Sequence, residues 1–449
     1  MRFFGPGLRR YFFGAVLVPA LVCIGPQRLM SGEDKAAGVE GFFAERFSGE
    51  FRALAYGTLQ EPGYSTQNPG NDFLRMPRYL GDLELRPDLR FNFNPLELTA
   101  KPRMRLEYGA RTGTSAREHG SKWDDEWYVN EWLARLKVRE NLLVSYGREN
   151  LQWGPSFLFS PSNPFFQDNG RRNPYVEVPG SDFARLVWIA KDPWTFSFIL
   201  NTEAGRNEPT GPDPFEKTYA AKIDYTGREN YASFILSHRE QAGESLGFFG
   251  GWTVSDALLL YCEGSLAKGG RALYPEEDQS PFGASMRQTY KDGAALKPVI
   301  LIGGSYTFES EGTFTVEYVH NRQGYGEAQA DTYYALRRKA AQALASGGKL
   351  SGLGRMTLGQ TAATGLKLLR RNYLMLQYTR NNVRDAVDLT LRWTQNLDDS
   401  SCQFTTLVTY FLGDHTELFS VGTAGGGGKN TEFGSVLDYR IMAGVKYTF

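Results

Sequence analysis

Apolar and polar residues alternate at every second position along much of the chain. In segment 98–111, apolar side chains alternate with a polar set that includes Arg103 and Arg105, and segments 128–139 and 387–394 repeat the pattern. Successive side chains of a β-strand point to opposite faces of the sheet, so a period of two places one set on each face. The sequence therefore predicts an all-β protein built from two-faced strands.

Short and long connections alternate between these predicted strands. The short turns are expected at 94–97, 140–141, 191–194, 226–230, 255–256, 309–312, 381–385 and 412–415. The longer connections are expected at 60–79, 112–126, 150–181, 204–216, 240–244, 267–297, 322–371, 397–400 and 423–434. Short turns at one end and long loops at the other are typical of an outer-membrane β-barrel.

The apolar face of each strand needs a cover, and two covers are compatible with the alternation. In a soluble sandwich a second sheet covers it, whereas in a membrane barrel lipid covers it and the polar face lines the lumen. Hydrocarbon offers no partner to an open sheet edge, so the strand near 46–59 must pair with the strand near 435–449. We therefore predict a transmembrane antiparallel β-barrel of about 18 strands with long extracellular loops.

The N-terminal residues predict a secretory signal. Arg2, Arg9 and Arg10 precede an apolar run at 11–25, which is the order of charge and hydrophobicity found in signal peptides. The run is too short to span a bilayer as a helix. We assign residues 1–25 to the signal peptide, expect cleavage between 25 and 38, and assign residues 39–449 to a single barrel domain.

Composition removes several classes of function. Lys and Arg together number 50, as do Asp and Glu, so binding to a polyanion through bulk charge is excluded and no nucleic-acid partner is expected. Aromatic residues make up 14% of the chain, which argues against disorder. Outside the signal, Cys262 and Cys402 lie in strands far apart in strand order, so we expect no disulfide.

No candidate site for catalysis or for a cofactor emerges from the motifs. The four histidines lie outside any nucleophile motif, and the sequence contains no metal-ligand cluster, phosphate loop or dinucleotide fingerprint. His320, near Glu317, is the one histidine placed suggestively, and a packing role is the favoured interpretation. The chain is therefore predicted not to be an enzyme and to bind neither a cofactor nor a metal.

The polar faces of the first strands predict a basic arc on the lumen wall. The pore-lining candidates are Arg86, Arg90, Lys101, Arg103, Arg105, Arg111, Arg135, Lys137, Arg139, Glu107 and Glu131. Later strands contribute a sparser and more neutral set. Charges on the lumen wall set the selectivity of a channel, so this arc favours anionic or polar solutes. The alternative is that neighbouring acids neutralise these residues and brace the wall.

The connection at 150–181 is predicted to be a compact ordered loop, and it is one of two candidates, with 322–371, for a loop that folds inward and narrows the lumen. Its prolines and its paired aromatics are unlike a merely flexible loop. Arginine can grip carboxylates and aromatic rings can stack on sugars. The constriction candidates are Arg148, Trp153, Arg171 and Arg172. The alternative for Trp153, Phe165 and Phe166 is that they pack the loop against the barrel wall.

The connection at 322–371 is predicted to contain helices. Asp331 is expected to cap a helix at Thr332–Ser346 that stops at Gly347, and a second helical stretch is expected at about 359–370. Such a pair could cover the outer mouth, enter the pore or lie outside the rim.

The end of the chain resembles that of known membrane barrels. The last predicted strand is apolar at alternate positions from Tyr439 to Phe449. This pattern is similar to the C-terminal signature that the barrel-assembly machinery recognises in bacterial outer-membrane proteins. The whole chain looks like an outer-membrane β-barrel of the porin or channel type. The resemblance implies location in the outer membrane, contact with its lipids and lipopolysaccharide, and recognition of the Phe449 strand by that machinery.

A second, local resemblance involves the constriction candidate loop. The stretch Gly147 to Pro155, followed by Ser160 and by Asn163 and Pro164, is similar to the G-R-x-x-x-x-W-G-P segment of capsule-assembly outer-membrane proteins. That family attaches surface polysaccharide. Two functions therefore stay open: a porin-like channel for polar or anionic solutes, or a barrel that binds, assembles or exports polysaccharide. Whether the chain forms a homo-oligomer stays open as well.

Overall fold

The computed structural model describes residues 46–449 except 64–67, 69–70, 72, 112–119, 208–214 and 290–294. The predicted signal peptide, its cleavage region and the expected start of the barrel domain at residue 39 lie outside the described residues. His119 and part of the connection predicted at 112–126 also lie outside them.

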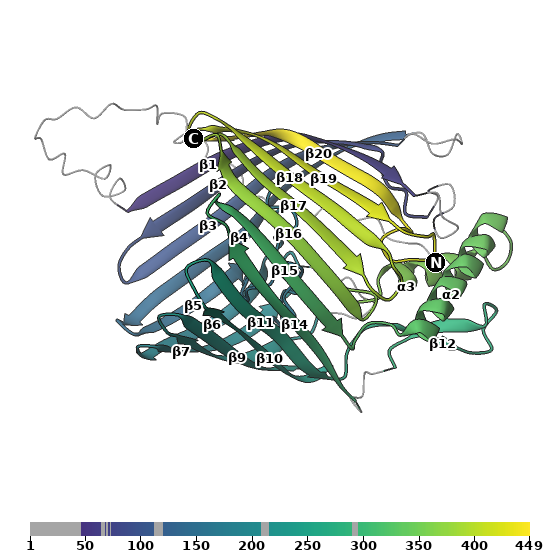
Figure 1. The fold of residues 1–449 in the computed structure, drawn as a ribbon, viewed down its shortest axis with the longest axis horizontal. Helices are drawn as coiled ribbons and strands as arrows, with labels where there is room; N and C mark the ends of the chain where they lie inside the picture. Colours follow the sequence, from purple (N-terminus) through teal and green to yellow (C-terminus); the bar gives the residue numbers. More distant parts are fainter. Residues whose placement is uncertain are drawn as a thin grey trace, which may run out of the picture. The chain divides into compact units, whose positions relative to one another are not determined.

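A closed antiparallel β-barrel forms the described part of the chain (Figure 1). Its sheet has 18 strands, and each strand pairs with the one that follows it in the barrel. The strands are β1 (Phe47–Pro62), β2 (Tyr79–Asn92), β3 (Leu96–Arg111), β4 (Gly120–Arg139), β5 (Leu142–Glu149), β6 (Ser181–Lys191), β7 (Trp194–Glu203), β8 (Thr218–Thr226), β9 (Asn230–Arg239), β10 (Gly243–Thr253), β11 (Leu258–Lys268), β14 (Leu296–Thr307), β15 (Gly312–Asn321), β16 (Asn372–Val383), β17 (Val387–Asn396), β18 (Cys402–Leu412), β19 (Thr416–Gly426) and β20 (Leu437–Thr448).

The first and last strands close the barrel. β1 pairs with β20 from Arg52 opposite Thr448 to Pro62 opposite Leu437, with a bulge near Glu61. Every predicted short turn falls between the expected strands, and these turns gather at the left end of the barrel in Figure 1. The predicted fold class, the strand number and the pairing of the first strand with the last are confirmed.

The two faces of the strands differ as the alternation predicts. On β2, Leu83 and Leu85 point outward and are 55% and 51% exposed. Glu84 and Arg86, which alternate with them, are buried on the lumen side. Outward apolar side chains such as Trp127 and Phe198 continue the apolar surface around the barrel. Lipid covers this surface in a membrane barrel, and the polar set faces the lumen.

One barrel strand is longer than the sequence indicated. We expected the connection after β3 to run to residue 126, but β4 begins at Gly120 and pairs with the outer half of β3. Its first residues are mostly charged or polar, which resembles a loop in sequence. Because β3 supplies a partner at every position from Leu96 to Arg111, the hydrogen bonds of the ladder hold this polar segment in a strand.

A small helical subdomain stands at the end of the barrel that carries the long loops. It consists of helices α2 (Glu327–Ser346) and α3 (Ser351–Ala362) and a hairpin of β12 (Tyr274–Glu277) and β13 (Ala284–Arg287), which the sequence did not predict. Buried residues from both helices and the hairpin share one apolar cluster, so they form one unit, called here the outer cap. No helix within the described residues is both long and apolar enough to cross a membrane.

The helix boundaries differ from the predictions at three of four ends. α2 starts after Gly326, one turn before the expected cap at Asp331, and the Gln329 side chain accepts the Gly326 N–H at 3.2 Å. It ends at Gly347, with φ 65°, as predicted. α3 lies at 351–362 rather than at about 359–370. Its glycines weaken the helical pattern in the sequence, but Gly354 lets it approach Ala340 O closely, where a Cβ would lie 2.5 Å away.

Candidate functional site

The connection between β5 and β6, residues 150–180, crosses the lumen and is called here the constriction loop. Two buried glutamates fasten it to one side of the wall. Glu263 on β11 accepts the hydroxyl hydrogens of Ser156 and of Ser162, the latter at 2.7 Å. Glu317 on β15 accepts the Phe157 and Leu158 N–H groups at 2.6 and 2.9 Å. Both carboxylates are 0% exposed, so these contacts hold the loop in place without competition from water.

The same loop is fastened to strands on the far side of the ring. Arg103 on β3 donates two hydrogen bonds to Glu177, each at 2.7 Å. Arg86 on β2 donates to Tyr175 O at 2.8 Å, and the Tyr175 ring stacks on Phe419 of β19 with centroids 3.8 Å apart. Attachment on both sides makes the loop a bridge across the lumen.

Aromatic side chains of the constriction loop pack against the wall. Trp153 and Phe165 meet edge to face at 5.9 Å, and Phe165 contacts Phe183 of β6 at 5.0 Å. Phe166 joins the same apolar cluster. Of the two interpretations offered for Trp153, Phe165 and Phe166, the structure shows the packing arrangement.

Most pore-lining candidates lie in ion pairs. Arg103 pairs with Asp88 and Glu177, and Arg105 pairs with Asp82 and Glu107. The remaining pairs are Arg86 with Glu84, Lys101 with Glu131, Arg90 and Arg135 with Glu97, and Lys137 with Glu140. Arg111 and Arg139 are exposed and have no ion pair within the described residues. The arc of β2 to β5 is thus basic in sequence but largely neutralised in the fold.

The constriction arginines play different parts. Arg148 pairs with Asp182 of β6 at 2.7 Å at the outer end of β5 and does not line the central cavity. Arg171 donates to the carbonyl oxygens of Gly154, Pro155 and Ser156, and so folds the loop on itself. Arg172 lines the cavity described below, and no ion pair or hydrogen bond to it occurs within the described ranges.

Two further arginines come close to the constriction loop without a carboxylate partner among the described residues. Arg392 on β17 donates to Gln377 Oε1 at 2.8 Å and to Arg171 O at 3.1 Å. Arg239 at the end of β9 donates to Pro164 O at 2.7 Å and to Thr218 Oγ1 at 3.2 Å. The sequence offered one signal for Arg239, an isolated inward-facing arginine at a strand end, but its contact with residue 164 depends on the fold.

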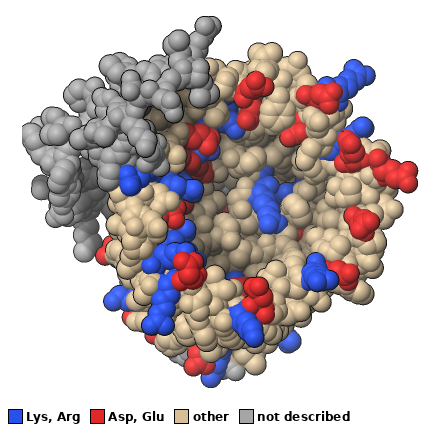
Figure 2. Space-filling model, turned by 90° about the vertical axis from the view of Figure 1, so that its left-hand side faces the viewer, with Lys and Arg blue, Asp and Glu red and all other residues tan. Residues whose placement is uncertain are grey.

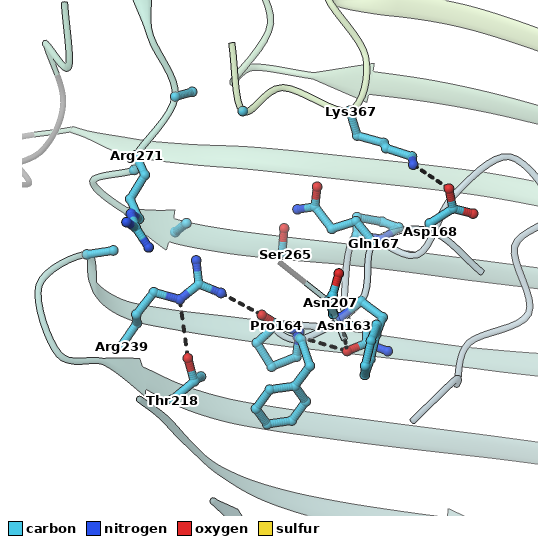
Figure 3. A pocket seen from close by; sticks show the side chains of 18 of the residues that line it. Asn163, Pro164, Gln167, Asp168, Asn207, Thr218, Arg239, Ser265, Arg271 and Lys367 are labelled. Atoms are coloured by element: carbon cyan, nitrogen blue, oxygen red, sulfur yellow. Dashed lines mark hydrogen bonds and ion pairs between the residues drawn. The ribbon is translucent and has the colours of Figure 1, made fainter. Parts of the chain in front are cut away.

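A cavity of about 1160 Å³ lies between the constriction loop, the wall at β8 to β11 and the segment that follows α3. Figure 3 shows Arg239 and Arg271 on one side of it and the Lys367–Asp168 pair on the other. Amide and hydroxyl groups line the space between them, including Asn163, Gln167, Asn207, Thr218 and Ser265. The cavity is therefore suited to a polar solute that exchanges hydrogen bonds with its lining.

One ion pair joins the constriction loop to the segment after α3. Lys367 Nζ lies 2.6 Å from Asp168 Oδ2. Burial raises the pKa of Asp168, but the hydrogen bond and charge of Lys367 outweigh it, so the pKa lies below its usual value. The carboxylate therefore stays ionised at neutral pH, and the two loops remain in contact at the edge of the cavity.

The short-turn end of the barrel opens into a hollow. Figure 2 shows this end, with basic and acidic groups interspersed around the mouth and basic groups deeper inside. The mixed signs at the mouth agree with the ion pairs along β2 to β5.

The described residues show no arrangement suited to binding a metal. No group of three His, Cys, Asp or Glu side chains in this part of the chain could hold a metal ion. Cys262 and Cys402 are free thiols.

Comparison with known proteins identifies the fold. No protein-family model and no curated protein sequence matches the chain. Among solved structures, Acinetobacter baumannii OccAB1 aligns over 90% of this chain and 96% of its own at 11% identity, with a TM-score of 0.54. The outer membrane protein OprD from Pseudomonas aeruginosa aligns over 90% of this chain and 94% of its own at 8% identity, with a TM-score of 0.53. Pseudomonas aeruginosa OccK5 (OpdH) aligns over 90% of this chain and 98% of its own at 10% identity, with a TM-score of 0.51.

These alignments cover nearly the whole of each chain. Because the sequence identity is so low, they show a shared fold and nothing more. The closed 18-strand antiparallel barrel of this chain therefore has the fold of these solved structures.

Proposed function

We propose that the protein is a channel that passes small polar solutes, with a preference for anions, across the outer membrane. The constriction loop carries the proposal. An 18-strand barrel is too wide for its own side chains to fill, so a loop fixed across the lumen determines how wide the passage is. The buried anchors Glu263, Glu317 and Arg103 fix this loop on both sides.

Charge at the constriction supports the preference for anions. The basic arc of β2 to β5 contributes little net field, because its arginines and lysines are paired with acids. Arg171, Arg172, Arg239 and Arg392 lie at or beside the constriction loop, and no ion pair to them occurs in the described part of the chain. A lumen charge that is not held in an ion pair is less neutralised than the charges of the arc and acts on a passing ion. The expected anion preference therefore comes from this group rather than from the arc predicted by the sequence.

The cavity supports polar solutes in general. Its amides and hydroxyls can replace the water around a solute, and Arg172 and Arg239 add positive charge to the same space. Passage requires binding that is favourable but weak, and hydrogen bonds to neutral groups meet that requirement.

Recording of purified protein in planar lipid bilayers tests the proposal. We expect discrete steps of conductance and, in a potassium chloride gradient, a reversal potential that shows chloride to be the more permeant ion. Arg172→Gln is expected to lower the chloride preference, because it removes a cavity charge that makes no ion pair among the described residues. The matched control is Lys349→Gln, which removes an exposed lysine between α2 and α3.

A barrel without conductance that binds purified capsule or exopolysaccharide contradicts the channel and supports the anchoring function instead. Cation preference in the wild type contradicts the proposed anion preference but leaves the channel function standing. An equal effect of Arg172→Gln and Lys349→Gln has the same meaning.

A further inference from the structure

Two arginines from different elements share one side of the cavity. Arg239 is the last residue of β9, and Arg271 follows β11 at the start of the connection to the outer cap. Both line the cavity, and Figure 3 shows them on the same side of it. The charged groups close enough to act on Arg239 are Arg271 and Glu216. Arg239, Arg271 and Glu216 together are called here the arginine corner.

The guanidinium group of Arg239 is held along one edge by neutral acceptors. Nε donates to Thr218 Oγ1 at 3.2 Å, and Nη2 donates to Pro164 O at 2.7 Å. A planar carboxylate binds an arginine most readily through two parallel hydrogen bonds to such an edge. Figure 3 shows the remaining nitrogen, Nη1, pointing away from both acceptors and into the cavity. Arg239 therefore offers a solute single hydrogen bonds from Nη1, because the protein occupies the edge formed by Nε and Nη2.

Glu216 sets the net charge of the arginine corner. Arg271 Nη1 lies 3.7 Å from Glu216 Oε2, which is close enough for an ion pair but too far for a hydrogen bond. The Glu216 side chain is only 4% exposed, so salt and water screen its charge little. Two guanidinium groups and one carboxylate leave one positive charge at the corner. A solute group with one negative charge is therefore neutralised there, whereas a group with two leaves an excess.

The other charged groups of the cavity do not change this balance. Asp168 is paired with Lys367, and Glu177 is paired with Arg103. Glu244 is exposed at the start of β10. Two further basic residues, Arg172 and Lys297, line the cavity but are not among the charges that act on Arg239.

The rest of the lining suits a solute that carries hydroxyl groups. Asn207 and Ser265 lie beside the arginine corner in Figure 3, and Asn163 and Gln167 of the constriction loop follow them. Amides and hydroxyls both donate and accept hydrogen bonds, so they can replace the water around a sugar or another polyol. A volume of about 1160 Å³ accommodates a solute of that size.

We propose that the arginine corner is a binding subsite for a sulfonyl group, as in a sulfonate or a sulfate ester, on a hydroxylated solute. Such a group carries one negative charge, which matches the corner. Its three terminal oxygens point in different directions, so they can accept single hydrogen bonds from Arg239 and Arg271. This inference rests on the proposed channel function, because it names the class of solute that passes. The charge is spread over three oxygens, which keeps each hydrogen bond weak, as passage requires.

Four solutes with the same sugar ring test this preference: glucose 6-sulfate, glucose 6-phosphate, glucuronate and glucose. They differ only in the group at carbon 6, which is singly charged and tetrahedral, doubly charged and tetrahedral, planar, or neutral. Binding to the purified barrel in detergent is measured by saturation-transfer NMR at about pH 8, where the phosphate ester carries nearly two charges. We expect glucose 6-sulfate to bind most tightly, roughly tenfold more tightly than glucose. This measurement does not depend on conduction.

Two variants at the arginine corner sharpen the test. Glu216→Gln adds one net positive charge to the corner, so glucose 6-phosphate is expected to bind more tightly than glucose 6-sulfate. A misfolded variant cannot produce this reversal. Arg271→Gln is expected to weaken the binding of glucose 6-sulfate roughly tenfold and to leave glucose unchanged. The matched control is Arg355→Gln on the exposed side of α3, which is expected to keep the wild-type order.

A wild-type barrel that binds glucuronate or glucose 6-phosphate at least as tightly as glucose 6-sulfate overturns the proposal. Retention of the wild-type order in Glu216→Gln overturns it as well. A barrel that prefers glucose 6-sulfate but shows no conductance in bilayers supports the subsite and contradicts the channel function. A conducting barrel without preference among the four solutes contradicts the subsite alone, so the two failures are distinguishable.

Discussion

At the scale of single residues, the lumen is organised by buried charges that hold backbone in place. Glu317 accepts two adjacent N–H groups of the constriction loop, and Arg103 grips Glu177 with two hydrogen bonds. Charges buried at this depth carry a large desolvation cost, which their partners must offset. Residues that look like solute-binding groups in the sequence therefore act mainly as fasteners in the fold. Under the proposed function, selectivity falls to the few charged residues that make no ion pair among the described residues.

The Arg103–Glu177 pair gives a prediction at this scale. Arg103→Leu leaves Glu177 without its partner and is expected to lower the free energy of unfolding by about 3–5 kcal/mol. Arg103→Leu combined with Glu177→Leu is expected to recover most of that loss, because position 177 then carries no carboxylate and Asp88, the other partner of Arg103, keeps its ion pair with Arg52. The measurement is urea-induced unfolding of the barrel in detergent. Equal destabilisation by the single and double variants would show that the pair does not fasten the loop.

At the scale of elements, the two long connections do different work. The constriction loop is bonded to strands on both sides of the ring, whereas the helices of the outer cap share their core with the β12–β13 hairpin. A unit that buries its apolar residues within itself can be removed with little effect on the stability of the barrel to which it is attached. The cap is thus expected to control access, and the constriction loop to control width.

Removal of the cap helices tests that division. Replacement of residues 327–362 by a short glycine-serine linker is expected to leave the barrel folded, because the barrel ladder does not include these residues. The conductance is expected to rise, since the cap no longer stands at the end of the barrel that carries the long loops. Heat-dependent gel mobility reports folding, and bilayer recording reports conductance. Failure of the shortened chain to fold would show that the cap belongs to the barrel's own stability.

At the scale of the whole molecule, closure between β1 and β20 determines whether a barrel exists at all. An open edge in hydrocarbon leaves backbone groups without partners, so the seam must form along its length. The seam is tight at Gly444, where an added Cβ would lie 2.4 Å from Ala55 O and 2.4 Å from Tyr56 Cβ. Strands β1 and β20 can approach each other here because this position has no side chain.

Gly444→Ala is accordingly expected to impair closure. We expect overpacking at the seam to lower the free energy of unfolding by about 1–3 kcal/mol. The folded fraction after refolding into lipid vesicles is expected to be smaller. Gly81→Ala on β2 is the matched control, since a Cβ there meets nothing within 4 Å. The folded fraction is measured by heat-dependent gel mobility. If the two variants fold equally well, the seam tolerates a Cβ at position 444, and the argument from close packing is wrong.

Sequence periodicity alone determined the barrel, its strand number and the ends at which short turns and long loops lie. This was possible because a strand exposes each face to a single environment, lipid or lumen, and so leaves a period of two at every crossing. Periodicity did not predict the polar start of β4, because pairing with β3 stabilises it. It also did not predict the bounds of the glycine-rich α3, because packing against Ala340 stabilises that helix.

Only part of the candidate site could be predicted from the sequence. The sequence pointed to the segment 150–181 and to Arg172 as candidates, but it did not show which charges are cancelled. That depends on residues far apart in the chain, such as Arg103 with Glu177 and Asp168 with Lys367. Periodicity reports which face a side chain occupies, whereas the partner across the lumen is decided only when the barrel closes and the loops fold inward.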